Sequence, residues 1–253
     1  MQPHSPLWHY LWLAPHAFQV SILAVMIRRK LYRDFPVFFA YTLWVAVLGV
    51  TLFVLDHISA VSPMLYWQVD WIDVIGSTVL RFGLIWEIFA HVFRPYPALW
   101  EVGKLVFRWA GAVLLLVAVA VAVYSPSPQG LWILSGVYVV DRTISIVQCG
   151  LLLFLFLFSS YFGLSWRSYV FGIATGLGIF ATVQLVASSV WIQTGPYNPS
   201  DIFSFVTMAT FHCCVLIWFF YLVSHEPVRR PVGEIPHNDL EVWDRELGRL
   251  LHG

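Results

Sequence analysis

Charged residues are scarce in this chain of 253 residues, of which Asp, Glu, Lys and Arg together make up 11%. An ordinary soluble domain carries about 25%. Long apolar runs stand in their place, with 59% of the residues hydrophobic and a mean hydropathy of +0.76. This composition excludes a soluble globular domain. The formal net charge of zero leaves no excess of positive charge for binding nucleic acid.

Cysteine and lysine are also rare. Cys149, Cys213 and Cys214 all fall inside apolar runs, so the sequence offers no outward-facing disulfide. The only lysines are Lys30 and Lys104, so the last apolar run has none that could form a Schiff base with retinal. The hydrophobic excess lies in Leu, Val, Phe and Trp, which excludes disordered, collagen-like and disulfide-rich secreted chains.

Seven apolar runs are long enough to cross a membrane, since a hydrocarbon core of about 30 Å needs about 20 apolar helical residues. They are Leu7–Ile27, Val37–Leu55, Tyr66–Phe93, Leu105–Val123, Leu131–Phe158, Tyr169–Ile192 and Ile202–Val223. The sequence therefore predicts an all-α membrane protein, with residues 1–225 forming a single bundle of seven transmembrane helices. On the sixth run, Gly172 and Gly176 lie one turn apart and predict close helix packing within the bundle.

The distribution of Lys and Arg predicts the orientation. Eleven of the 14 fall in connectors on one side of the bundle or in the tail, and Arg108 lies in the first turn of the fourth run on that same side. Only Arg81 and Arg142 lie deep inside the runs. Because positively charged loops stay in the cytoplasm, we expect the N-terminus outside and the C-terminus inside. The first run is expected to be an uncleaved anchor, since its charges follow the apolar stretch.

The third run carries five ionisable side chains. They are Asp70, Asp73, Arg81, Glu87 and His91. At about 100° per residue they share one helix face about 120° wide. A charge at the centre of a bilayer costs at least about 2.5–3.5 kcal/mol, so this face is expected to meet other helices or water.

The fifth run carries a second polar stripe. Its members are Tyr138, Asp141, Arg142 and Gln148. If the two runs are neighbours, Arg142 is at the right depth to reach Asp73, and Arg81 to reach Asp141. Two interpretations stay open. The charges form a neutral network that fixes the helix register, or they line a ligand cavity or ion path at the midplane.

Glu87 and His91 are four residues apart near the end of the third run, which is a spacing that can hold a metal ion. Catalytic zinc sites use three protein ligands, and no second paired histidine motif accompanies this one. The sequence therefore predicts a secondary polar pair at a helix end, with no metal site and no cofactor.

The composition of the chain changes after Val223, where the last long apolar run ends. Three prolines, Pro227, Pro231 and Pro236, keep the start of residues 226–253 extended. Beyond them, hydrophobic residues from Leu240 to Leu251 recur on one side of a short helix, with charges on the other. We expect a cytoplasmic tail whose amphipathic helix lies on the membrane or docks on a protein partner.

Three segments reach from the third run to the sixth, namely Glu87–Leu99, Asp141–Ser159 and Gly163–Gly176. Together they resemble an uncharacterised family of seven-span membrane proteins found in Acidobacteria. The resemblance implies a location in the bacterial inner membrane. It brings no assigned activity with it.

The sequence favours a receptor-like or sensor-like protein that binds a small molecule or lipid in an intramembrane polar pocket and acts through a partner. The alternative is a non-enzymatic scaffold or assembly subunit of a membrane complex. A transporter or channel is less favoured, because the runs show neither internal repeats nor helices broken by Gly and Pro. No nucleophile–base or metal constellation indicates an enzyme.

Overall fold

The computed structural model describes residues 6–58, 62–93, 143–150, 168–194 and 200–224, with shorter pieces at 100–116 and residue 153. These parts are all helical and contain no strand. The longer helices are α1 (Pro6–Arg28), α2 (Pro36–His57), α3 (Pro63–Phe93), α6 (Tyr169–Thr194) and α7 (Ser200–Val223), and a 3-10 turn, η1 (Leu31–Arg33), joins the first two. The predicted all-α class is confirmed, and each helix begins and ends within three residues of its predicted run.

Four of these helices, α1, α2, α6 and α7, are long and apolar enough to cross a membrane. The protein is therefore membrane-embedded. Helix α3 has 31 residues but carries Asp70, Asp73, Arg81 and Glu87, and it is not among the four. Most of the predicted fourth and fifth runs lies outside the described residues.

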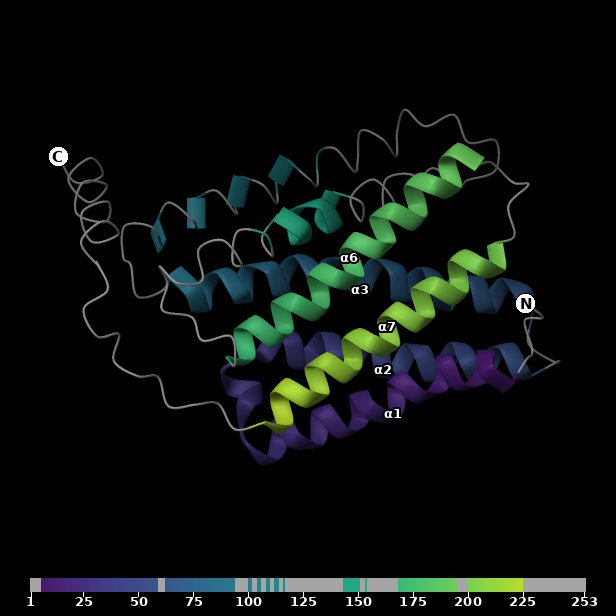
Figure 1. Ribbon diagram of the computed structural model, residues 1–253, viewed down its shortest axis with the longest axis horizontal. Helices are drawn as coiled ribbons and strands as arrows, with labels where there is room; N and C mark the ends of the chain where they lie inside the picture. Colours follow the sequence, from purple (N-terminus) through teal and green to yellow (C-terminus); the bar gives the residue numbers. More distant parts are fainter. Residues whose placement is uncertain are drawn as a thin grey trace.

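The five long helices form a ring around a common centre. Neighbours around it are α6, α7, α1, α2 and α3, and contacts between α3 and α6 close the circle. All five run roughly along the long axis of the molecule (Figure 1), with α6 and α7 nearest the viewer. The ring has two ends, which we call the Arg29 end and the His57 end after residues in the connections there.

A densely packed core fills the ring toward the Arg29 end. Trp218 of α7 is 1% exposed, meets Phe38 of α2 edge to face at 5.4 Å, and donates a hydrogen bond to the Ile173 carbonyl of α6 at 3.3 Å. A Cβ at Gly176 would overlap the Trp218 indole, and one at Gly172 would overlap the Tyr221 ring. The predicted packing of this glycine pair within the bundle is confirmed.

The beginning of α2 is capped from another helix. Proline occupies its first position, and the next two amide groups have no carbonyl to bind within the helix. Val37 N–H donates to Glu87 Oε1 at 2.8 Å, and Phe38 N–H donates to Glu87 Oε2 at 2.9 Å. The carboxylate also faces the positive end of the α2 dipole. Glu87 thereby ties α3 to the start of α2.

The end of α7 is capped in the complementary way. Arg29 follows α1, and its guanidinium donates to the carbonyls of Leu222 at 2.8 Å and Val223 at 2.7 Å. It reaches the Ser224 carbonyl at 3.2 Å and the Tyr169 hydroxyl of α6 at 3.4 Å. A cation is stabilised at a helix C-terminus, where carbonyl groups lack partners. Arg29 therefore holds α1, α6 and α7 together.

We predict that Glu87→Gln destabilises the bundle by about 2 kcal/mol, because the amide can accept at one position only and loses the charge that favours the α2 dipole. The midpoint of thermal unfolding, followed by tryptophan fluorescence in detergent, measures this. The matched control is Glu101→Gln, which breaks an exposed pair with Lys104 and should cost less than about 1 kcal/mol. Equal shifts for the two variants would contradict the capping role of Glu87.

Candidate functional site

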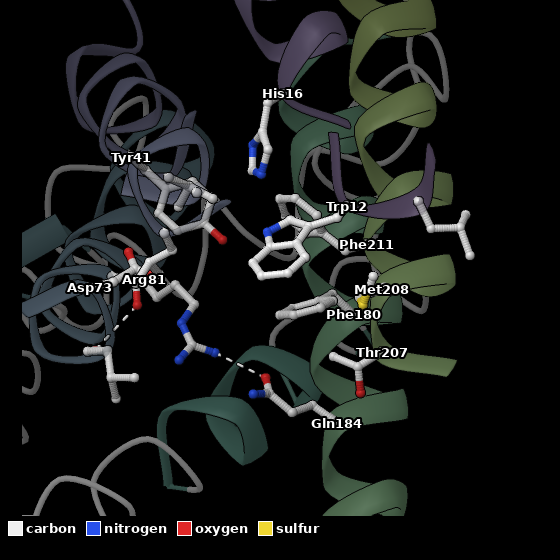
Figure 2. Close-up of a pocket in the computed structure, with 16 residues that line it drawn as sticks. Trp12, His16, Tyr41, Asp73, Arg81, Phe180, Gln184, Thr207, Met208 and Phe211 are labelled. Atoms are coloured by element: carbon white, nitrogen blue, oxygen red, sulfur yellow. Dashed lines mark hydrogen bonds between the residues drawn. The ribbon is translucent and has the colours of Figure 1, made fainter. Parts of the chain in front are cut away.

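A cavity of about 330 Å³ lies inside the ring, on the His57 side of the core. Every one of the five long helices contributes to its wall, as Figure 2 shows for the main side chains. The lining residues are Leu11, Trp12 and His16 of α1; Tyr41, Val45, Gly49 and Leu52 of α2; Asp73, Val74, Ser77 and Arg81 of α3; Phe180 and Gln184 of α6; and Thr207, Met208 and Phe211 of α7.

Arg81 provides the positive charge of the cavity. The residue is 5% exposed, and its guanidinium extends from α3 toward α6 (Figure 2). Its Nη1 donates a hydrogen bond to Gln184 Oε1 at 3.3 Å. This bond joins the two helices that close the ring, and both of its residues line the cavity.

Asp73 provides the negative charge, from a position eight residues before Arg81 on α3. Its Oδ1 atom is buried and accepts no hydrogen bond of good geometry, although the indole N–H of Trp44 on α2 lies close enough to interact with the carboxylate. A buried polar atom without a partner costs about 1–3 kcal/mol, and more if the group is charged. A bound molecule that donates a hydrogen bond to Asp73 would recover that free energy.

The remaining wall is aromatic and apolar with a few neutral polar groups. Trp12, Phe180 and Phe211 surround the space in front of Arg81 (Figure 2). His16 is fixed by a 2.8 Å hydrogen bond from its Nδ1–H to Gln19 Oε1. Its ring lies against Gly49 of α2, where a Cβ would overlap the imidazole. The histidine can sit in the wall only because residue 49 has no side chain.

The predicted polar stripe of the third run divides between separate places. Asp73 and Arg81 line the cavity, whereas Asp70 is partly exposed and does not. Glu87 and His91 lie at the Arg29 end, where the Glu87 carboxylate binds α2. His91 Nδ1–H donates to the Glu87 backbone carbonyl at 3.0 Å, and its ring stacks on Phe35 at 4.4 Å.

The second predicted stripe is described only in part. Gln148 is 3% exposed and is not among the residues lining the cavity, and its Oε1 and Nε2 atoms make no hydrogen bond. The next residue, Cys149, lies 3.2 Å from the Thr182 hydroxyl of α6. Tyr138, Asp141 and Arg142 lie outside the described residues, so the expected pairing of Arg81 with Asp141 and of Arg142 with Asp73 stays a prediction.

Five polar residues of the wall were missing from the predicted site, namely His16, Tyr41, Ser77, Gln184 and Thr207. All are neutral, so reasoning from charged side chains passed over them. Two of them, His16 and Gln184, could have been found from the sequence, because His and Gln are unusual inside apolar runs. His16 also has Gln19 three residues further along the same helix face.

No group of three or more His, Cys, Asp or Glu side chains suited to a metal ion occurs in the described part of the chain. No family model, curated protein or solved structure matches this sequence. The arrangement of the cavity itself is therefore the basis for any functional assignment.

We predict that Gly49→Ala destabilises the protein by about 1–3 kcal/mol, because the new Cβ must displace the His16 ring from the cavity wall. Gly150→Ala is the matched control, since a Cβ there meets no atom within 4 Å. It should leave stability unchanged or raise it slightly, as Ala is the better helix former. Thermal unfolding in detergent compares the two. A Gly49→Ala variant as stable as the control would contradict this packing.

Proposed function

We propose that this protein binds a small polar molecule in the central cavity and acts as a membrane receptor or sensor. The observation that carries the proposal is the pairing of two charged side chains, Asp73 and Arg81, with an aromatic wall inside a closed ring of helices. Ligand pockets combine mostly apolar walls with a few polar groups that fix the orientation of the ligand.

The free energy of burying charge supports a ligand. Burying the side chains of Arg81 and Asp73 in this interior costs far more free energy than burying leucine would. Glu87 balances a similar cost by capping α2, but Asp73 Oδ1 has no such partner. A cavity of 330 Å³ also has the volume of about ten water molecules. It therefore suits a small metabolite better than a lipid chain.

The membrane arrangement that goes with this proposal has seven spans, the N-terminus outside and the tail of residues 226–253 in the cytoplasm. The Lys and Arg asymmetry supports it, since Arg28 and Arg29 lie at the end of the ring opposite His57. The resemblance to the Acidobacteria family supports the bacterial inner membrane. The tail is then the proposed contact with a protein partner that carries the signal onward.

A scaffold or assembly subunit is the second candidate. Its support is that the buried carboxylate of Glu87 joins α3 to α2, so a structural use of the other buried charges is consistent with the chain. Transport is less favoured, because the described long helices are continuous, including α1, which runs through Pro15 without a break.

The test compares variants that fill the cavity or neutralise its charge with matched controls beside them. We expect native mass spectrometry of the gently purified full chain to show a bound small molecule. Thr207→Trp should abolish that bound mass by filling the space, and Asp73→Asn should lower its occupancy at least tenfold. The controls are Val206→Trp, at a position that is 40% exposed, and Asp70→Asn, which lies outside the cavity.

The two control variants should keep the bound molecule, because neither changes the wall. A ligand lost equally from cavity variants and controls would contradict binding at this place. A bare chain without any small molecule, but with a stoichiometric protein partner, would favour the scaffold.

A further inference from the structure

Two histidines from different helices meet at the His57 end. His9 lies in the first turn of α1 and His57 is the last residue of α2, 48 positions later. Their Nε2 atoms are 3.0 Å apart, and the ring centroids are 5.1 Å apart. The pair is separate from the central cavity, and neither residue belongs to the predicted site.

The surroundings of His57 fix which nitrogen carries its proton. Its Nδ1 is 2.8 Å from the Phe53 backbone carbonyl, which can only accept a hydrogen bond, so Nδ1 carries the hydrogen. The Asp56 carboxylate is 3.8 Å from the same nitrogen. In the neutral ring, Nε2 therefore presents its lone pair toward His9. Metal-binding histidines are held in this way, with the second nitrogen donating to a carbonyl or carboxylate.

The spacing of the two Nε2 atoms fits a divalent metal ion. With metal–nitrogen bonds of about 2.0–2.1 Å, two adjacent ligands of a square-planar or octahedral ion lie about 2.9 Å apart, and those of a tetrahedral ion about 3.3 Å. The observed 3.0 Å lies between these values. A linear two-coordinate ion would need about 4 Å, which the pair does not provide.

We propose that His9 and His57 form a binding site for a divalent first-row transition metal ion, with imidazole Nε2 atoms as its two protein ligands. Water completes the coordination, because no group of three or more suitable ligands is found in the described part of the chain. Copper(II) should bind most tightly, followed by nickel and zinc, as for nitrogen ligands in general.

The site would join the start of α1 to the end of α2 beside the cavity. Phe53 packs on the His57 ring at 4.3 Å and meets Trp12 edge to face at 5.4 Å, and Trp12 lines the cavity. A bound ion would therefore stiffen the wall next to Trp12. This inference does not depend on the proposed ligand.

The experiment adds copper(II) to the purified full chain without a histidine tag and measures binding by calorimetry and electron paramagnetic resonance. We expect the wild type to bind an ion whose spectrum shows coupling to two imidazole nitrogens. His9→Ala and His57→Ala should each weaken its affinity at least tenfold and remove that coupling. The control is His91→Gln at the opposite end, where Nδ1 is held by a backbone carbonyl, and it should bind as the wild type does.

Wild-type affinity in either single variant would overturn the proposal, because both ligands are required. So would a wild-type spectrum without two-nitrogen coupling, which would mean that the histidines form a hydrogen bond only. Thermal unfolding without metal checks folding, and a variant that binds weakly while unfolding at the wild-type temperature supports the site.

Discussion

The first free amides of α2 donate hydrogen bonds to the Glu87 carboxylate of α3, and this contact sets the geometry of the rest of the ring. Two hydrogen bonds of 2.8 and 2.9 Å fix both the height and the rotation of α3 against α2. Arg81 lies six residues earlier on α3, about 120° away around that helix. With Glu87 held on α2, Arg81 lies at the other edge of the same helix face, and both Arg81 and Asp73 line the cavity.

Charged side chains serve two purposes in this membrane protein. The two differ in how many of their polar atoms have hydrogen-bond partners. At the Arg29 end, Glu87 meets two amides and Arg29 meets the last carbonyls of α7, so each charge answers groups that a helix end leaves unpaired. In the cavity, Asp73 retains an oxygen without a donor.

The helices could be predicted from the sequence because run length and hydrophobicity follow directly from the thickness of a bilayer. Angular position also predicted that Asp73 and Arg81 share a face. The role of Glu87 could not be predicted, because its partners lie about 50 residues earlier in the chain and are backbone groups. The need for glycine at position 49 could not be predicted either, because it depends on the His16 ring, which comes from another helix and lies against it.

Helix α1 connects the polar features of the molecule. It contributes His9 at one end, Trp12 and His16 to the cavity, and the chain that leads directly to Arg29 at the other end. Sliding α1 along its axis would break the bonds of Arg29 to α7, so the Arg29 end opposes such a movement. At the His57 end, the contact between the two imidazoles holds α1 against α2. If a molecule that enters the cavity displaces the first turns of α1, an ion between His9 and His57 would oppose that displacement. By linkage, an ion and a ligand that favour different positions of α1 must weaken each other's binding by the same factor.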